Sequence, residues 1–215
     1  GHMVPQTGRA ARATRESGRQ TRDALFTAAT ELFLEHGEGV PITQICAAAG
    51  AHPNQVTYYY GSKERLFVEV ACAAVLRAGK RAEDDAATAE TVGDYTEKLV
   101  GSLLGPGAPS VELFTSAMLM TGRRSELRDL ITDTLRTLHS SGEVALIRTL
   151  MRTGWQLRAG IDVESKAFWS AIFGLVIQKT ATGESFGYSL EEAVAVIFAN
   201  LQIPETVRNT SIDGS

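Results

Sequence analysis

One stretch near the N-terminal end, residues 43–67, constrains the fold of this chain more than any other. Its sequence, TQICAAAGAHPNQVTYYYGSKERLF, predicts two short helices joined by a tight turn, followed by the start of a long helix. Gly50 lies where the first helix would stop, because glycine tolerates the left-handed conformation of a helix cap. We expect His52 to be the N-cap of the second helix and Pro53 its first residue, where the missing N–H costs nothing. This arrangement is typical of a helix-turn-helix, whose second helix enters the major groove of DNA.

The second helix of this motif, residues 53–60, carries side chains that suit DNA. Asn and Gln can pair with base edges, whereas hydroxyl groups and tyrosines suit phosphates. A lysine just after the helix adds a cation close to the DNA backbone. The candidate DNA-binding residues of the motif are Thr43, His52, Asn54, Gln55, Thr57, Tyr58, Tyr59 and Lys63.

These residues resemble the TetR family of bacterial transcriptional regulators. Residues 45–50, ICAAAG, match the family's Ile-Ala-x-x-Ala-Gly segment with a cysteine at one alanine position, and residues 58–66, YYYGSKERL, resemble its aromatic-rich ending with Lys and Leu. The sequence departs from the pattern at Thr57, where Tyr is common, at Tyr60, where Phe is usual, and at Pro41, where a phosphate-binding Thr often caps the first helix. The detailed resemblance covers residues 19–81, and beyond them only the helical layout compares.

Apolar residues recur at helical spacing along the rest of the chain, which predicts an all-α fold. No segment has a convincing strand period, and no internal repeat is visible. Ser189 and Glu192 form a capping-box pattern before the last helix. The expected helices outside the motif cover residues 19–36, 63–87, 91–104, 109–121, 125–153 with a kink at 140–142, 163–182 with Asp162 as N-cap, and 190–201.

This layout predicts an N-terminal helix-turn-helix domain of three helices and a C-terminal helical domain for ligand binding and dimerisation. The N-terminal residues contain Arg9, Arg12 and Arg15 without apolar periodicity, as in a flexible basic arm that adds phosphate or minor-groove contacts, or in a merely solvated tail. Residues 1–3, Gly-His-Met, look like an expression scar. The predicted parts are residues 1–18 for the arm, 19–62 for the DNA-binding domain, 63–204 for the ligand-binding and dimerisation domain, and 205–215 for a frayed tail.

Charge is divided unevenly between the two ends of the chain. Residues 1–81 hold 10 basic and 7 acidic residues, whereas residues 82–215 hold 11 basic and 18 acidic residues. A basic end on an acidic body fits a protein that touches phosphate at one end only. The net charge of −4 argues against nonspecific nucleic-acid binding by the chain as a whole.

Apolar runs and cysteines give weaker indications of where the protein works. No apolar run approaches the roughly 18–20 residues of a membrane span, and no signal-peptide core follows the N-terminus, so we expect a cytoplasmic protein without membrane contact. Cys46 and Cys72 both lie on predicted helices. They are expected to be buried, reduced thiols, with a redox switch as the alternative.

The resemblance also implies a homodimer. In the TetR family the last two helices pack against the same helices of a second subunit, and here these helices have more apolar surface than one domain should need to bury. The alternative is that both apolar faces belong to the internal core. The candidate interface residues are Phe168, Ile172, Leu175, Val194, Ile197, Phe198 and Leu201.

The resemblance further implies a small-molecule effector, which in the family binds between the helices of the body and shifts the fourth helix, here residues 63–87. The candidate lining residues are Phe114, Met118, Trp155 and Trp169, and for each of them ordinary core is the alternative. We expect no cofactor and no metal site. His139 and Glu143 lie four residues apart, but two ligands do not make a metal site.

The sequence therefore predicts a transcriptional regulator, a repressor that a small molecule releases from a palindromic operator in double-stranded DNA. One alternative is a DNA-binding or protein-docking factor on the same fold that needs no ligand. A remote alternative is a hydrolase, because residues 183–187, GESFG, match the G-x-S-x-G pattern. That chemistry needs a strand before Ser185, and a predicted helix stands there instead, so we do not expect an enzyme.

Overall fold

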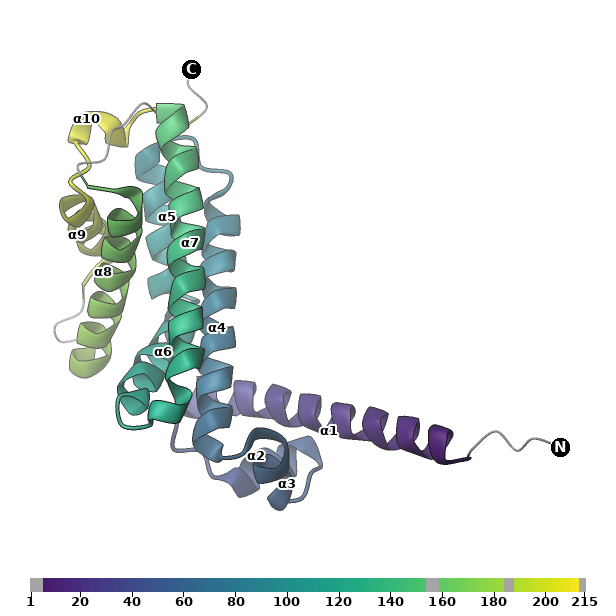
Figure 1. Cartoon of the computed structure of the whole chain (residues 1–215). Coiled ribbons are helices and arrows are strands. Elements are labelled where there is room, and N and C mark those ends of the chain that lie inside the picture. The colour runs from purple at the N-terminus through teal and green to yellow at the C-terminus, as the bar shows by residue number, and fades with distance from the viewer. Residues whose placement is uncertain (1–5, 154–158, 184–187, 213–215) are drawn as a thin grey trace. The chain divides into compact units, whose positions relative to one another are not determined.

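The computed structural model describes residues 6–153, 159–183 and 188–212, and helices dominate them (Figure 1). The described ranges contain no strand, so the predicted all-α fold is confirmed. None of the helices in these ranges is long and apolar enough to span a membrane. In chain order the elements are α1 (Gln6–His36), α2 (Ile42–Ala49), α3 (Asn54–Tyr60), α4 (Lys63–Ala86), α5 (Val92–Leu104), α6 (Ala108–Thr121), the 3-10 helix η1 (Ser125–Leu127), α7 (Arg128–Thr153), α8 (Ile161–Thr182), α9 (Leu190–Leu201) and α10 (Glu205–Arg208).

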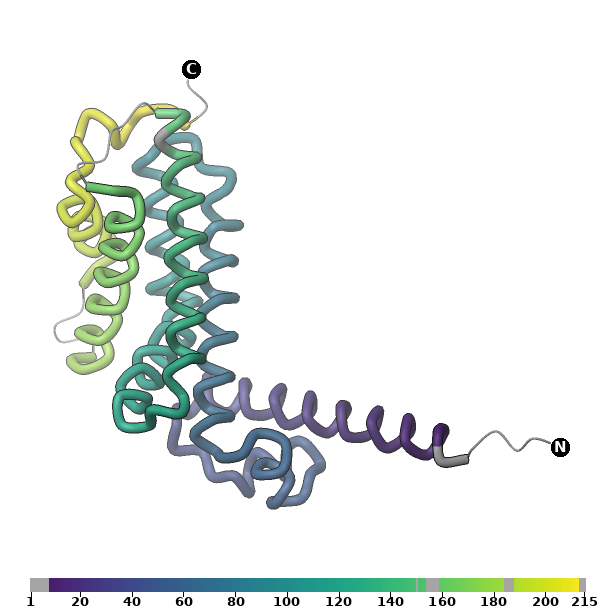
Figure 2. The backbone as a smooth tube through the Cα atoms, viewed as in Figure 1, coloured from purple at the N-terminus to yellow at the C-terminus, as the bar shows by residue number. Residues whose placement is uncertain are grey.

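Contacts between residues divide the chain into two compact units, Gly1–Val70 and Ala71–Ser215. We refer to them as the N-terminal unit and the C-terminal unit. Helix α4 begins in the first unit and continues without a break into the second, as the backbone trace in Figure 2 shows. In the C-terminal unit α8 packs against α6, α7 and α9, while α5 packs against α9.

The core of the N-terminal unit is formed by the apolar faces of its helices. Leu25 and Phe33 of α1, Ile45 of α2 and Val56 of α3 are completely buried. The ring of Phe33 meets the ring of Phe67 from α4 edge to face, with centroids 5.1 Å apart. Aromatic pairs of this kind add to the stabilisation from burial alone. This core holds α3 in a fixed orientation for the surface that it presents.

Helix α1 is longer than the sequence analysis predicted. It begins at Gln6, although residues 4–18 were expected to form an arm without regular structure. Periodicity failed there because the side chains from residue 8 to residue 17 are exposed, so no neighbour imposes an apolar stripe. Residues 6–18 nevertheless contain three Ala and three Arg, and both residue types have high intrinsic helix propensity.

Several predicted helix boundaries are corrected by the structure. Pro53, rather than His52, is the N-cap of α3, and Gly160, rather than Asp162, is the N-cap of α8. Helix α7 runs through residues 140–142 as one helix. The cap of α9 was predicted correctly, because the Ser189 hydroxyl accepts a hydrogen bond from the Glu192 N–H at 3.1 Å.

The prediction of a frayed tail is wrong for residues 205–212. Residues 205–208 form α10, and the backbone beyond it pairs with the start of α5. The Val92 N–H donates to the Thr210 carbonyl at 3.3 Å, and the Ile212 N–H donates to the Glu90 carbonyl at 2.7 Å. Main-chain hydrogen bonds need no regular spacing of apolar side chains, so the apolar pattern of the sequence did not indicate this pairing.

Candidate nucleic-acid interface and ligand cavity

The turn between α2 and α3 depends on one glycine. Gly50 has φ 66° and ψ 32°, the left-handed conformation that the sequence analysis predicted for this position. The N–H groups of Gly50 and Ala51 donate to the carbonyls of Ala47 and Cys46 at 3.3 Å and 2.9 Å, so the last carbonyls of α2 are satisfied. At its other end α2 begins after Pro41, which makes no side-chain cap.

Helix α3 buries one side and exposes the other. Val56 and Tyr60 are buried, and the Tyr60 hydroxyl donates to the Arg22 carbonyl of α1 at 2.7 Å. Asn54, Thr57 and Tyr58 are exposed, with 79% of Tyr58 accessible to solvent. Since residues three and four apart share a helix face, these three side chains form one polar surface, which we call the α3 face.

Two other candidate residues of α3 contribute to the fold as well. The Gln55 side-chain oxygen accepts a hydrogen bond from the His52 N–H at 2.8 Å, so it satisfies a donor at the start of the helix. The Tyr59 ring is half-buried and stands edge to face with the ring of Tyr58, centroids 4.8 Å apart. A side chain on Gly18 of α1 would come within 3.2 Å of the Tyr59 hydroxyl. The sequence analysis missed this close approach of Gly18.

The remaining candidates lie just before and after α3. Thr43 on α2 and His52 in the turn are exposed. Lys63 is half-exposed and is the first residue of α4. The Ser62 hydroxyl caps that helix by accepting a hydrogen bond from the Arg65 N–H at 3.1 Å. The position of Lys63 is therefore fixed by a capped helix end directly after α3.

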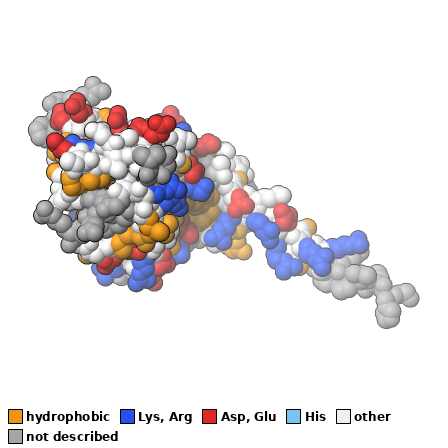
Figure 3. Space-filling view, turned by 90° about the horizontal axis from the view of Figure 1, so that it is seen from above, with side chains coloured by type: hydrophobic (Ala, Val, Ile, Leu, Met, Phe, Trp, Pro, Cys, Tyr) orange, Lys and Arg blue, Asp and Glu red, His pale blue; other side chains and the backbone are white. Residues whose placement is uncertain are grey.

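Basic side chains also follow α1. Arg9, Arg12, Arg15 and Arg19 are exposed at spacings of three and four residues, which places them along one side of the helix. Figure 3 shows Lys and Arg side chains gathered along α1. These arginines, which the sequence analysis assigned to a flexible arm, lie on a helix that also contributes to the core of the N-terminal unit.

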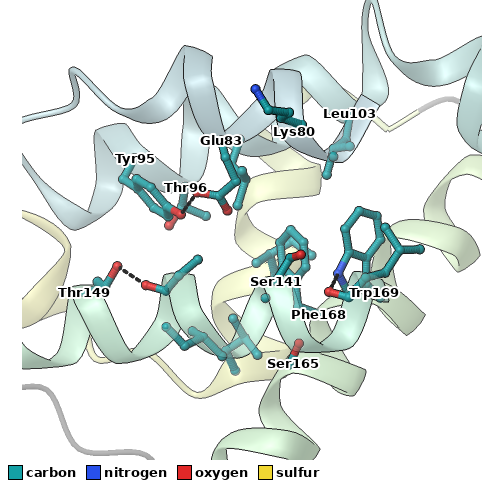
Figure 4. A pocket seen from close by; sticks show the side chains of 18 of the residues that line it. Lys80, Glu83, Tyr95, Thr96, Leu103, Ser141, Thr149, Ser165, Phe168 and Trp169 are labelled. Atoms are coloured by element: carbon teal, nitrogen blue, oxygen red, sulfur yellow. Dashed lines mark hydrogen bonds between the residues drawn. The ribbon is translucent and has the colours of Figure 1, made fainter. Parts of the chain in front are cut away.

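The C-terminal unit encloses a cavity of about 450 Å³ (Figure 4). Its wall comes from α4, α5, α7, α8, α9 and the residues that follow α9. The apolar side chains of the wall are Leu76, Val92, Leu99, Leu103, Leu138, Ala145, Leu146, Phe168, Trp169, Ile197, Leu201 and Ile203. The polar side chains are Lys80, Glu83, Tyr95, Thr96, Thr137, Ser141, Thr149 and Ser165.

Glu83 of α4 and Tyr95 of α5 form the central polar pair in this wall. The Tyr95 hydroxyl donates to Glu83 Oε2 at 2.7 Å. Burial raises the pKa of the Glu83 carboxyl, and the Tyr95 hydrogen bond and the charge of Arg148 offset only part of that rise. Burial and then the neighbouring Glu83 charge raise the pKa of Tyr95, so its hydroxyl keeps its proton. The carboxylate is thus held in an environment that disfavours its charge.

Two hydrogen bonds join α8 to α7 beside the cavity. Trp169 Nε1 donates to the Leu138 carbonyl at 3.1 Å, and the Ser165 hydroxyl donates to the His139 carbonyl at 2.7 Å. Gly142 makes this close packing possible, because a side chain there would collide with the Ser165 hydroxyl. These contacts fix the Trp169 ring in the cavity wall.

Only one of the four predicted effector residues is found in the described cavity wall. Trp169 lines the cavity, whereas Phe114 and Met118 are not among its lining residues. Phe114 is instead fully buried against the ring of Phe173, with centroids 5.7 Å apart. Trp155 lies outside the described residues. The sequence analysis missed Glu83, which looks like the first member of an acidic run with two exposed aspartates and carries no local sign of burial.

Most of the predicted interface residues lie in the interior of the single chain. Ile172, Leu175, Ile197, Phe198 and Leu201 are buried within a single chain, so they have no surface left for a second one. Phe168 lines the cavity together with Ile197 and Leu201, and Val194 is half-buried. The alternative of an internal core is therefore correct for most of these side chains. The large exposed apolar residues of the two helices are Val163, Ile177, Leu190 and Val196.

The hydrolase motif, the metal-ligand candidates and the cysteines form no catalytic or metal site in the described residues. Ser185 lies outside the described residues, and the segment ahead of it, α8, is a helix rather than the strand that a nucleophile elbow requires. In the described ranges no three His, Cys, Asp or Glu residues gather as metal ligands would. Cys46 and Cys72 are both buried, the Cys72 thiol donates to the Leu130 carbonyl at 3.6 Å, and burial raises the pKa of the Cys46 thiol.

Comparisons with known proteins assign the family. A family model described as the C-terminal domain of bacterial transcriptional repressors matches residues 92–198, and no curated protein matches the chain. A transcriptional regulator from Rhodococcus sp. RHA1 has a similar crystal structure, with 96% identity and a TM-score of 0.83 over 88% of this chain and 99% of that one. A TetR-family regulator from Rhodococcus sp. covers 89% of this chain and 100% of its own at 16% identity and a TM-score of 0.63. The regulator FadR from Bacillus subtilis, solved in complex with stearoyl-CoA, covers 84% and 95% at 17% identity and a TM-score of 0.59.

These matches agree with the arrangement of the helices and with the motif at residues 43–67. The chain belongs to the TetR family of bacterial transcriptional regulators.

Proposed function

We propose that this protein is a homodimeric repressor that binds a palindromic operator through α3 and is released when a small molecule occupies the cavity of the C-terminal unit. The observation that carries this proposal is the α3 face. It presents an amide, a hydroxyl and a phenol to solvent from a helix whose opposite side is locked into a core. Such a rigid polar surface suits the edges of bases and the phosphates beside them.

The candidate DNA-binding residues fall into two groups, those that suit base edges and those that suit phosphates. Asn54 has a free amide on the α3 face and is the best candidate for a base edge, whereas Gln55 has already committed its oxygen to His52. Tyr58, Thr57 and Lys63 are the candidates for phosphates, with Thr43 and His52 beside them. The arginines of α1 add positive charge that would strengthen binding without choosing a sequence.

Helix α4 is the element that can couple ligand to DNA. It begins with Lys63, directly after α3, and its later turns contribute Leu76, Lys80 and Glu83 to the cavity wall. A ligand that favours one position of α4 changes the population of the DNA-binding state by its difference in affinity for the two states. A shift from 99:1 to 1:99 needs about 5.5 kcal/mol. The FadR complex with stearoyl-CoA supports a ligand in this kind of fold.

The dimer is proposed to form through the exposed apolar residues of α8 and α9. Val163 and Ile177 lie fourteen residues apart on α8 and so share a face, and Val196 is exposed on α9. A two-fold dimer would present two α3 helices to half-sites about 34–36 Å apart. The palindrome of the operator follows from this symmetry.

Selection of bound duplexes from a pool of genomic fragments, followed by fluorescence anisotropy on the selected site, tests the DNA side. Lys63→Ala should weaken binding to every duplex, and Asn54→Ala should relax sequence choice by roughly 1–3 kcal/mol, the value of one good base contact. Glu97→Ala, an exposed change on α5, is the control. Unchanged affinity and specificity in both α3-region variants would overturn the assignment, and a reporter gene behind the selected site decides between repression and activation.

Light scattering on the purified protein tests the dimer. Ile177→Glu and Val196→Glu place a charge on the proposed interface and should give a folded monomer, because an unpaired buried charge is costly. Leu119→Glu is the matched control, since Leu119 is 74% exposed on α6. A dimer in all three variants would refute this interface.

A further inference from the structure

The cavity wall has almost no hydrogen-bond donors left to offer. The Thr96, Thr137 and Thr149 hydroxyls donate to backbone carbonyls within their own helices at 2.8 Å, 3.0 Å and 3.0 Å. Ser165 and Trp169 donate to carbonyls of α7, and Tyr95 donates to Glu83. These six groups can still accept a hydrogen bond through an oxygen or present a ring, but their protons are committed.

Lys80, the charged donor of the wall, does not replace the donors that are already committed. Lys80 is exposed over 81% of its side chain, and its ammonium lies 3.7 Å from Asp84 on the next turn of α4. In Figure 4 its side chain points away from the cavity, whereas Glu83 points toward Tyr95 and Thr96. A ligand inside the cavity therefore meets the Glu83 carboxylate rather than the Lys80 ammonium.

Glu83 retains capacity to accept further hydrogen bonds. An ionised carboxylate has about four lone-pair positions, and here Tyr95 uses one of them. The surroundings are mainly leucine, isoleucine and aromatic side chains. An anion in such surroundings is poorly solvated, so a cation that reached it would gain more than the same pair would in water.

We propose that the cavity takes an apolar molecule bearing a protonated amine, and that Glu83 is the residue that pairs with the ammonium group. An ammonium group has three donors and no acceptor, which complements a wall that offers acceptors and one negative charge. A carboxylic acid would bring a second negative charge to Glu83, and among the described wall residues only Ser141 and the exposed Lys80 keep a donor for its oxygens.

The inference deepens the proposed function, because it names the ligand class of the same cavity. The burial of Glu83 is consistent with the inference, because its raised pKa means that the Tyr95 hydrogen bond and the charge of Arg148 do not fully stabilise the charged form. A ligand cation supplies that stabilisation. Tyr95 is then a positioning residue, since its hydrogen bond fixes the carboxylate without itself contacting the cation.

Three probes with the same apolar skeleton test the inference: 4-phenylbutylamine, 4-phenylbutan-1-ol and 4-phenylbutanoate. Titration calorimetry on the full chain at pH 7.5 should show the amine binding about tenfold or more tightly than the other two, as expected for a charge-assisted bond in an apolar site. Glu83→Gln should lower the affinity for the amine by a similar factor and change the affinity for the alcohol by less than about threefold.

Asp84→Asn is the matched control. It removes the same charge one residue away on α4, but Asp84 is exposed and does not line the cavity, so the amine should bind as it does to the wild type. The inference is overturned if the carboxylate binds as tightly as the amine, if no amine binding is detected, or if Glu83→Gln leaves it unchanged. An equal loss in Asp84→Asn would also overturn it, because the effect would then come from surface charge.

Binding and DNA release are measured separately, so the two proposals can fail separately. An amine that binds through Glu83 without changing operator affinity would support the ligand class and refute effector release. Release of the operator by the carboxylate probe, lost on filling the cavity by Gly79→Phe, would support effector release and refute the ligand class.

Discussion

The two units of this protein place their polar groups in opposite ways. In the N-terminal unit the aromatic and aliphatic side chains meet in the middle, as in the Phe33–Phe67 contact, and Asn54, Thr57 and Tyr58 point outward. In the C-terminal unit polar groups such as Glu83 and Tyr95 line an internal space of about 450 Å³. An outer polar surface suits a partner of fixed shape such as duplex DNA, whereas an enclosed space with polar groups in its wall suits a small molecule.

This difference also affects how firmly each unit holds its side chains. A side chain beside an empty space lacks neighbours on one side and loses the dispersion contacts that a filled core provides. Residues of the cavity wall therefore contribute less to stability than equally buried residues of a filled core. A ligand that fills the space should restore those contacts and stabilise the folded state by mass action.

The largest expected effect comes from two matched substitutions. Leu25 and Leu103 are both buried, but Leu25 of α1 lies in the filled core of the N-terminal unit, whereas Leu103 of α5 lines the cavity. Leu25→Ala should cost near the upper end of the range of about 2–5 kcal/mol for such changes, and Leu103→Ala near the lower end. Denaturant unfolding measures both, and equal costs would contradict the contrast between the two interiors.

A second prediction concerns the close packing of α7 and α8. Gly142→Ala places a methyl group against the Ser165 hydroxyl and should cost about 1–3 kcal/mol through overpacking. Gly142→Ala combined with Ser165→Ala should recover part of that loss, because the colliding atom is gone. Gly79→Ala is the control, since its new methyl would lie no closer than 3.5 Å to any neighbour. Melting temperatures that fall equally in the Gly142 and Gly79 variants would exclude a specific collision.

A third prediction concerns the buried polar group of the N-terminal unit. Tyr60→Phe removes the hydroxyl that donates to the Arg22 carbonyl and should cost about 0.5–1.5 kcal/mol, the usual net value of one hydrogen bond. The ring still packs at 6.5 Å from Phe26, so the fold should be retained. Denaturant midpoints compared with those of the exposed variant Tyr58→Phe measure the effect, and a loss in Tyr58→Phe as large as in Tyr60→Phe would count against it.

The smallest expected effect is a gain in stability, whereas the three substitutions above should each cause a loss. Because burial raises the pKa of Glu83, its contribution to stability is greatest when the carboxyl is protonated and is lost as pH rises from the unfolded pKa through the folded one. Glu83→Gln, which is neutral throughout, should therefore melt at a higher temperature than the wild type at pH 7.5. The difference should vanish near pH 4, around the ordinary pKa of a glutamate. A variant that melts lower at pH 7.5 would show that the charge is already well compensated.

Residues 43–67 were predictable because the helix-turn-helix is specified locally. Gly50 determines the turn by its own backbone conformation, and the side chains of α3 follow from helical spacing. The same spacing failed for α1 before residue 19, because an exposed helix carries no apolar stripe. It also failed for the tail, which is held by main-chain bonds.

The cavity could not be predicted, since an internal space is not a property of any one segment. Its wall takes residues from helices far apart in the sequence, and the one acidic residue described in it, Glu83, stands next to two exposed aspartates. Ile197 and Leu201 show the same difficulty. Their apolar stripe on α9 is compatible with a partner subunit or with the interior, and only the arrangement of the helices decides between them.

The pairing of residues 210–212 with residues 90–92 has a mechanical consequence. It joins the end of the chain to the first turn of α5, so the segment between them forms a closed ring, held by bonds such as that from Ile212 to Glu90. Val92 at this joint and Ile203 just ahead of the tail both touch the cavity. A displacement of residues 210–212 would therefore be transmitted through these main-chain bonds to the edge of the cavity.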